Sequence, residues 1–209
     1  MVLNILGKGP VLFVGCHPDD VEYGCGGVIS KLGKSVPIHV ITLSKNQENP
    51  DNKNVLKESK DSLNSLGIKK ENIVFGDFVT REFSYSRQEI CDFLWKIGKK
   101  INPSCIFIPP YDLHQDHQVG HDECLRVFRT KTILEYDIPR SEKFPKPVIF
   151  VQLNQKNLND KLKALSKYKT YQKKNYFQKE VIVAACKSNG VKVEIPLCEV
   201  FSPISIIWK

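Results

Sequence analysis

Hydrophobic residues along the chain follow two alternating patterns. Short, continuous apolar runs recur between longer segments in which apolar residues return every three or four positions. The runs predict strands that are buried on both faces, and the longer segments predict amphipathic helices. The predicted strands are Val11–Gly15, Ile38–Leu43, Ile73–Phe75, Cys105–Ile108, Val148–Leu153, Val181–Ala184 and part of Glu199–Trp208. The predicted helices are Gly26–Leu32, Asn52–Leu66, Arg87–Lys100, His117–Phe128 and Leu158–Tyr168.

This alternation of strands and helices predicts the fold class. It is typical of an α/β protein, here a three-layer, Rossmann-like domain with a mostly parallel central sheet and helices on both faces. No repeat or Pro/Gly/Ser-rich linker divides the sequence, so residues 1–209 are expected to form one domain. Ser44–Asp51 and Thr130–Lys146 follow neither pattern and are expected to be irregular walls of a cleft. In such a sheet, ligands bind beyond the carboxyl ends of the strands.

Composition narrows the class of protein. The chain has 209 residues, of which 41% are hydrophobic and 26% charged, as in an ordinary globular domain. It has no apolar stretch of the roughly 20 residues that a membrane helix needs and no signal-peptide pattern at its start. A cytoplasmic location is therefore expected. The seven cysteines are odd in number and form no C-x-x-C pair, which argues against a disulfide framework or a zinc ribbon.

Much of the net charge of +8 comes from the lysine-rich segment 156–179. Such a segment could bind a nucleic acid, an anionic membrane surface or a phosphate-bearing substrate. It could equally be a solvated helix face, because Leu158, Leu162 and Leu165 supply an apolar stripe at helical spacing. The second interpretation is favoured, since no arginine–aromatic motif accompanies the lysines. No nucleic-acid partner is expected.

A chemically unusual motif, His17-Pro18-Asp19-Asp20, follows the first apolar run directly. Proline fixes one backbone torsion and removes an N–H, so the segment is predicted to be a stiff turn. Carboxylates and a histidine crowded at a strand end are costly to bury unless a cation pairs with them. A metal ion is the simplest such partner.

A second motif, Asp112-Leu113-His114-Gln115-Asp116-His117, follows another apolar run. If the two strands are adjacent, one histidine and one aspartate from the first motif and one histidine from the second could bind zinc. Three protein ligands and a position for water are the arrangement of catalytic zinc sites. Each motif also has a simpler explanation, because two histidines can share a helix surface and an aspartate can be an N-cap. His121, one helical turn beyond His117, is either a rival ligand or a surface residue.

These motifs carry a family resemblance. In order and spacing, His17-Pro18-Asp19-Asp20, Gly24-Cys25-Gly26-Gly27 and His114-Gln115-Asp116-His117 resemble the zinc-dependent de-N-acetylases called LmbE-like or PIG-L. The resemblance runs from Val11 to about Phe201. Two departures bear on the substrate pocket rather than the metal: the acidic residue common after the paired aspartates is Val21 here, and Tyr171 follows Tyr168-Lys169-Thr170 where related sequences tend to have glutamine.

The resemblance implies roles for individual residues. His17, Asp20 and His117 would be the metal ligands, and Asp19 would be the general base. His114 would stabilise the oxyanion, either protonated beside a neighbouring carboxylate or as the correct neutral tautomer. Asp116 would orient His114 or a ligand histidine. The residues expected to contact the substrate are Arg81, Tyr111 and Asp112.

The function expected from this resemblance is a zinc amidohydrolase, with another divalent transition metal as an option. Its substrate would be an N-acetylated amino sugar of GlcNAc type, conjugated to a carrier that can bear phosphate, in bacterial surface-glycan or related biosynthesis. A homo-oligomer is also expected. Two alternatives stay open: hydrolysis of an N-formyl or other small amide at the same centre, and a non-catalytic basic glycan- or nucleic-acid-binding protein. The latter would hold structural zinc with His114 or His121 as a fourth ligand.

Overall fold

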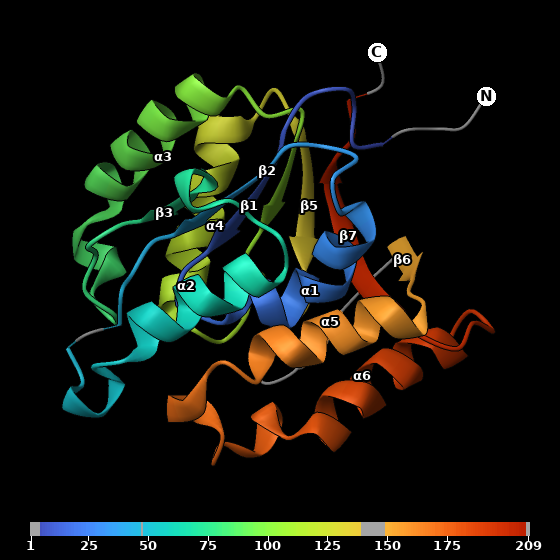
Figure 1. Cartoon of the computed structure of the whole chain (residues 1–209). Coiled ribbons are helices and arrows are strands. Elements are labelled where there is room, and N and C mark those ends of the chain that lie inside the picture. The colour runs from blue at the N-terminus through green and yellow to red at the C-terminus, as the bar shows by residue number, and fades with distance from the viewer. Residues whose placement is uncertain (1–4, 47, 139–148, 208–209) are drawn as a thin grey trace.

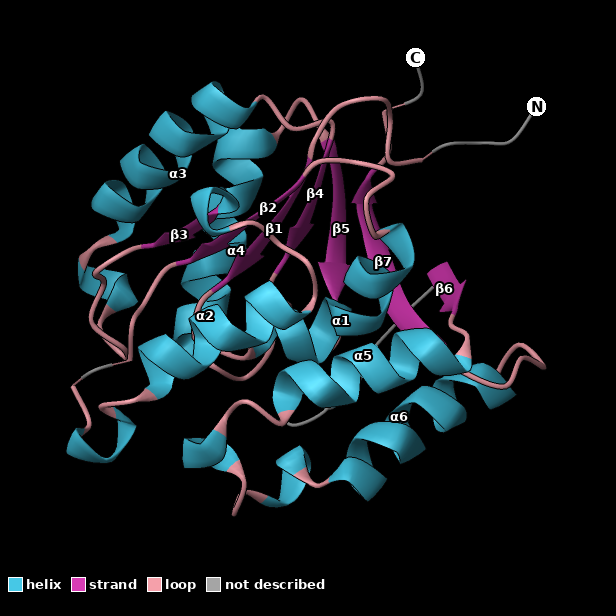
Figure 2. Cartoon of the chain, in the orientation of Figure 1, coloured by secondary structure: helices cyan, strands magenta, loops and turns pink. Residues whose placement is uncertain are grey.

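The computed structural model describes residues 5–46, 48–138 and 149–207. Within them, seven strands form one sheet in the order β3-β2-β1-β4-β5-β7-β6 (Figure 2). Five neighbouring strands are parallel: β1 (Val11–Gly15), β2 (Ile38–Thr42), β3 (Ile73–Phe75), β4 (Cys105–Ile108) and β5 (Thr132–Tyr136). Strand β7 (Cys198–Ser205) runs antiparallel to its two neighbours, β5 and β6 (Ile149–Gln152).

Helices cover both faces of this sheet. On one face lie α1 (Asp20–Leu32), α2 (Val55–Ser65), α5 (Gln155–Leu165) and α6 (Lys179–Val191), and on the other lie α3 (Arg87–Ile101) and α4 (Gln115–Phe128) (Figure 1). Strand β1 shows why the sheet needs two cover layers. Its residues Val11 and Phe13 join the core on the α1 side, whereas Leu12 and Val14 join the core on the α4 side. Both faces are apolar, so both are buried, and the predicted three-layer α/β fold is confirmed.

The sheet has a topological switch point between β1 and β4. From β1 the chain moves outward to β2 and β3, and it then returns to β4, on the other side of β1, and continues to β5. The loops that leave β1 and β4 therefore turn away from each other at the same edge of the sheet. In open α/β sheets this is where a crevice for ligands forms.

Two predicted elements are wrong. Val181–Ala184 lies inside helix α6, where Ile182, Cys186 and Gly190 form a buried stripe with a helical repeat. The run of β-branched residues suggested a strand, but the spacing of the buried positions is that of a helix. The segment Thr130–Lys146, expected to be irregular, contains strand β5; its part from 139 onward, like Val148 and Trp208, lies outside the described residues.

Helix α1 begins earlier than predicted, at Asp20 rather than Gly26. Its glycines are poor helix formers, yet they lie inside the helix because neighbouring elements approach closely there. A Cβ atom on Gly27 would lie 2.4 Å from Cδ1 of Leu153. The glycines therefore serve helix packing, and the early start places Asp20 in the first turn of α1.

Two expectations from composition can be compared with the described residues. All seven cysteines are free thiols, in agreement with the argument against a disulfide framework, and all except Cys91 are buried. No helix in the described parts of the chain is both long and apolar enough to cross a membrane.

Candidate metal and catalytic site

The first motif forms a tight turn between β1 and α1. Asp19 adopts a left-handed backbone conformation, with φ 100°, and immediately precedes the helix. The Asp20 carboxylate folds back on the turn: its Oδ2 accepts hydrogen bonds from the N–H groups of Cys16 (2.9 Å) and His17 (2.8 Å). The turn thus fixes Asp20 and presents Asp19 to the cleft beyond the sheet.

The second motif joins β4 to α4 and meets the first. The Nδ1 atom of His114, the N-cap of α4, accepts a hydrogen bond from the N–H of Asp116 (3.2 Å). The ring of His17 lies with its centroid 4.6 Å from that of His114 and 5.3 Å from that of His117. The two motifs thus form one cluster, at the switch point between β1 and β4.

A buried carboxylate lies behind each of two histidines. His17 Nε2 donates to Asp116 Oδ2 at 2.9 Å, and His117 Nδ1 donates to Asp112 Oδ2 at 2.8 Å. The other ring nitrogens, His17 Nδ1 and His117 Nε2, then face Asp20 Oδ2 at 3.6 and 3.4 Å. Histidines that bind metals are usually held in this way by a carboxylate on the far ring nitrogen.

This geometry fits a divalent cation. His117 Nε2 is buried and makes no hydrogen bond, and ligand atoms of His17, His114 and His117 all lie within 4.8 Å of one another. Ligand atoms at tetrahedral positions around zinc, with bonds of about 2.1 Å, are separated by about 3.4 Å. The two nitrogen-to-Asp20 distances are close to that separation. Asp20 and His114 are therefore both in position to complete a set with His17 and His117.

The electrostatics of the cluster also favour a cation. Although burial opposes the ionisation of Asp20, His117 and His17 hold its pKa below the usual value. Burial likewise opposes a charge on His117, but Asp20 and Asp112 raise its pKa to about 10. The carboxylates thus attract positive charge to the point between the rings, where a metal ion would replace the proton.

Of the two states expected for His114, protonated or neutral, the structure favours the neutral ring. Burial, together with the neighbouring His17 and His117, lowers the pKa of His114 to about 4, so its ring is neutral near pH 7. The carboxylate of Asp116 contacts His17 instead of His114. Because the Nδ1 atom of His114 accepts a hydrogen bond, its proton is on Nε2. Asp116 was expected to orient either His114 or a candidate ligand histidine, and its contact with His17 supports the second of these.

A cleft of about 1160 Å³ opens over the cluster. Its base includes His17, Asp19, Asp20, His114 and His117, and its walls include Asn46, Glu48, Arg81, Leu113, Tyr171, Lys173, Lys174 and Tyr176. Residues of the loop after β2, including Asn46 and Glu48, form one wall, as predicted for Ser44–Asp51. Within that segment, Gln47 lies outside the described residues and Pro50 and Asp51 belong to a short 3-10 helix. Arg81 lies beside the cluster, since its backbone N–H donates to Asp116 Oδ2 at 2.7 Å. Asp19 stands in the cleft with a raised pKa, because of burial and the adjacent Asp20.

Two predicted substrate contacts lie elsewhere. Asp112 is buried behind His117 and does not line the cleft, and its Oδ1 accepts the N–H of His114 at 2.8 Å. Tyr111 is also absent from the cleft lining, and its ring lies edge-on to His121 with centroids 5.4 Å apart. His121 itself is buried, with Nδ1 3.1 Å from Glu135 Oε2, so it is not a surface residue.

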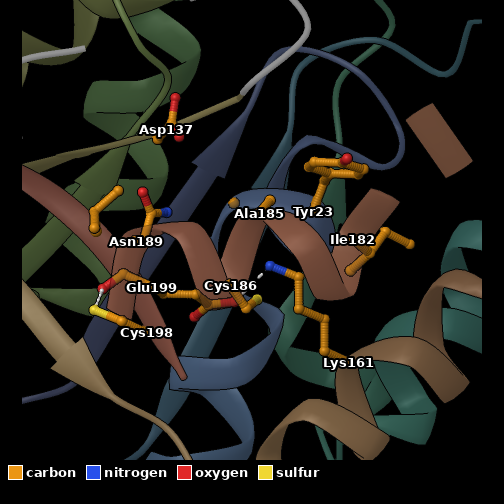
Figure 3. Close-up of a pocket in the computed structure, with 11 residues that line it drawn as sticks. Tyr23, Asp137, Lys161, Ile182, Ala185, Cys186, Asn189, Cys198 and Glu199 are labelled. Atoms are coloured by element: carbon orange, nitrogen blue, oxygen red, sulfur yellow. Dashed lines mark hydrogen bonds and ion pairs between the residues drawn. The ribbon is translucent and has the colours of Figure 1, made fainter. Parts of the chain in front are cut away.

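Lys161 is a residue whose place the sequence interpretation missed. The lysine-rich segment was expected to be a solvated face, but Lys161 is buried and its Nζ lies 2.7 Å from Glu199 Oε1 (Figure 3). Glu199 also accepts hydrogen bonds from the backbone N–H groups of Gly27 and Val28. The sequence did contain a signal for the burial of Lys161. Lys161 lies three positions after Leu158 and four positions before Leu165, and this helical spacing places it on the same apolar stripe. Lys173 and Lys174, from the same segment, line the cleft.

Comparisons with known proteins agree with this site. The family model of PIG-L, GlcNAc-PI de-N-acetylase, matches residues 12–128. The uncharacterized deacetylase YaiS of Escherichia coli (strain K12) is 26% identical over 171 residues, which are 77% of this chain and 90% of YaiS.

Two solved structures show how widely the fold is used. N,N'-diacetylchitobiose deacetylase from Pyrococcus horikoshii has a TM-score of 0.78 at 22% identity, over 95% of this chain and 84% of that one. GalB, the 4-carboxy-2-hydroxymuconate hydratase of Pseudomonas putida KT2440, has a TM-score of 0.77 at 12% identity, over 96% and 98% of the two chains. The fold alone therefore does not fix the reaction. The match to the family model covers more than half of the chain, and on that basis the chain belongs to the PIG-L family, also called LmbE-like, and is a hydrolytic deacetylase.

Proposed function

We propose that this protein removes the N-acetyl group from an N-acetylated amino sugar of GlcNAc type, joined to a carrier, with zinc in the His/Asp cluster. The observation that carries the proposal is the convergence of His17 Nδ1 and His117 Nε2 on Asp20 Oδ2, with a carboxylate behind each histidine. His17, Asp20 and His117 would hold the metal. When bound, the metal would supply a Lewis acid and lower the pKa of water towards about 7.

In this proposal Asp19 moves the proton. The Asp19 carboxylate lies in the cleft beside Asp20, but the two residues have different backbone conformations. Asp20 therefore holds the metal, while Asp19 faces the substrate. Asp19 takes a proton from the attacking water and delivers it to the nitrogen of the departing amine. The raised pKa of Asp19 suits a group that must both accept and release a proton.

His114 then acts as a hydrogen-bond donor. With Nδ1 occupied by the Asp116 N–H, its Nε2–H is the free donor of the ring. We assign this N–H to the carbonyl oxygen of the acetyl group as negative charge develops there. A neutral donor fits the lowered pKa of the ring and needs no proton from solution.

The cleft supports a conjugated sugar rather than a free small amide. Its volume of about 1160 Å³ exceeds the roughly 300–1,000 Å³ of a typical small-molecule pocket. Arg81, Lys173 and Lys174 line it and can contact hydroxyl or phosphate groups of a carrier. An N-formyl or other small amide is the alternative substrate at the same centre.

The direct test is incubation of the zinc-loaded protein with N-acetylhexosaminyl conjugates that carry nucleotide, lipid, peptide or no aglycone. Mass spectrometry should detect the loss of one acetyl group from at least one of them, and matched N-formyl conjugates test the alternative acyl group. A protein that binds zinc but deacylates none of these substrates would contradict the proposal.

The His114→Ala variant separates the catalytic from the non-catalytic site. If His114 is a donor, this variant keeps its zinc but loses turnover. If His114 is the fourth ligand of a closed structural site, the variant loses zinc as well.

A further inference from the structure

The loop from Pro109 to His114 carries two groups of the proposed site, and side chains outside that site hold it in place. It leaves β4, turns over the sheet edge and enters α4. Asp112, which supports His117, and His114 both lie on it. The position of this loop therefore determines the orientation of the His114 and His117 rings.

The second half of the loop is held by hydrogen bonds within the cluster. Asp112 accepts the N–H of His114 on Oδ1 and the Nδ1–H of His117 on Oδ2, both at 2.8 Å. The backbone oxygen of Asp112 accepts a hydrogen bond from Gln118 Nε2 at 2.7 Å. Asp112 is thus tied to the first turn of α4 by three contacts.

The first half of the loop is held by a buried pair that the proposed mechanism does not use. His121 Nδ1 lies 3.0 Å from the backbone oxygen of Pro109 and 3.1 Å from Oε2 of Glu135. The same Oε2 accepts the backbone N–H of Tyr111 at 3.3 Å. Glu135 stands on β5, directly beside Ile108, the last residue of β4. The pair thus joins α4 and β5 to the loop through side chains that do not line the cleft.

We propose that His121 and Glu135 are positioning residues, which set Asp112 against His117 and thereby raise the affinity of the site for its metal. Tyr111 directly precedes Asp112, so loss of the Glu135 contact lets the loop move and weakens the support of His117 Nδ1. Groups that hydrogen-bond a metal ligand directly are typically worth about 10- to 100-fold in metal affinity. His121 and Glu135 act one contact further out, through the loop that carries Asp112, so their effect should lie at the low end of that range. The inference rests on the proposed metal site, and its test separates the two.

The test uses the geometry of histidine. The amide nitrogen of asparagine can take the place of Nδ1, whereas that of glutamine takes the place of Nε2. We expect His121→Gln to weaken zinc binding by about 10-fold, the low end of the range for direct support of a ligand. We expect His121→Asn to recover to within about threefold of the wild type, because it keeps a donor for Pro109 and Glu135. Zinc affinity is measured by competition with a chromophoric chelator, with thermal unfolding as the check of folding.

Glu135 gives the same test from the other partner. Glu135→Gln keeps an acceptor oxygen and should retain most of the zinc affinity. Glu135→Ala removes the acceptor and should weaken zinc binding by about the same factor as His121→Gln. Kinetics on the zinc-saturated variants should show a fall in kcat with KM little changed, because the cleft walls are untouched. The control is His39→Gln, on β2 and outside this loop, which should bind zinc like the wild type.

The outcomes are distinct. Wild-type protein that binds no zinc overturns the proposed function and this inference with it. If the wild type binds zinc and the folded His121→Gln variant binds it with equal affinity, this inference alone is overturned. A lower unfolding temperature of that variant would then show that His121 only supports the fold. If His121→Gln does not fold, the comparison of Glu135→Ala with Glu135→Gln decides the matter.

Discussion

Two clusters of buried charged residues lie along helix α1, and they differ in how their charged groups are paired. At the start of α1, Asp20 meets His17 and His117, with Asp112 and Asp116 behind them. In the later part of α1, Glu199 meets Lys161 and the backbone N–H groups of Gly27 and Val28. Both clusters are buried and both cross between elements distant in the sequence.

The two clusters differ in how many of their buried polar atoms form hydrogen bonds within the cluster. Glu199 Oε1 accepts from Lys161 Nζ at 2.7 Å and from Gly27 N at 2.8 Å, while Oε2 accepts from Val28 N at 2.7 Å. One positive side chain balances one negative side chain. The first cluster instead leaves His117 Nε2 and Asp116 Oδ1 buried without a hydrogen bond. A buried polar atom of this kind costs about 1–3 kcal/mol, and a bound cation would relieve that cost at His117 Nε2, in agreement with the proposed metal site.

This comparison distinguishes a structural cluster from a functional one. Charge alone does not do so, because both clusters contain ionisable groups with shifted pKa values. Completeness offers a criterion: the Lys161–Glu199 cluster satisfies its own hydrogen bonds, as a cluster that supports the fold should, whereas the other cluster leaves His117 Nε2 for the proposed cation. The following predictions test this distinction.

The largest effect is expected from Asp19→Asn. The asparagine keeps the shape of the side chain but cannot accept the proton, so turnover should fall by about 10²- to 10⁴-fold. Zinc content, measured by elemental analysis, should be unchanged because Asp19 is not a ligand in the proposal. The matched control is Asp77→Asn, which removes an exposed carboxylate paired with Lys45. Wild-type turnover in Asp19→Asn would exclude Asp19 as the base.

The Lys161→Met variant should break the structural cluster. It leaves the Glu199 carboxylate buried without its cation, and the free energy of unfolding should fall by about 3–5 kcal/mol. Chemical denaturation measures this change, and zinc affinity of the folded protein should stay the same. A Lys161→Met/Glu199→Gln double variant should regain part of the loss, because no uncompensated charge remains. A single variant as stable as the wild type would show that the pair does not support the fold.

The sequence predicts the functional cluster better than the structural one, for a physical reason. The site consists of two short motifs at strand ends, and the rule that ligands bind beyond those ends brings His17 and His114 together in advance. The partners Lys161 and Glu199 lie 38 positions apart in segments without a motif. Only the packing of both α5 and β7 against α1 brings them into contact, and no sequence motif signals this.

The misassigned elements and contacts have similar causes. A short β-branched run does not distinguish a strand from a helix, and in Val181–Ala184 the tertiary packing decided in favour of the helix. Asp112 is among the residues that the sequence analysis expects to contact the substrate. Its actual direction depends on the loop conformation, which turns the carboxylate towards His117. Sequence identifies which residues carry chemistry, but not which way a loop side chain points.

Asp112→Asn tests how the functional cluster depends on its supporting carboxylates. The asparagine can keep an oxygen for the N–H of His114, but it loses the charge that stabilises the Nδ1–H of His117. Zinc affinity should fall by about 10- to 100-fold. Asp122→Asn, which makes the same change at a partly exposed position of α4 paired with Arg87, should leave zinc affinity unchanged. Equal affinities in the two variants would remove Asp112 from the metal site.

The smallest effect concerns the backbone of Asp19. Its φ of 100° is unfavourable for any residue with a Cβ, and such a conformation costs about 1–3 kcal/mol. Asp19→Gly should relieve that strain and Asp19→Ala should keep it, while both variants lose the carboxylate and the activity. Denaturation of the metal-free proteins should therefore find Asp19→Gly more stable than Asp19→Ala by about 1 kcal/mol, after the entropy cost of glycine is subtracted. An alanine variant as stable as the glycine variant would show that the turn relaxes without strain. The expected order would show that the protein retains a strained residue beside Asp20, in agreement with the proposed role of the Asp19 carboxylate.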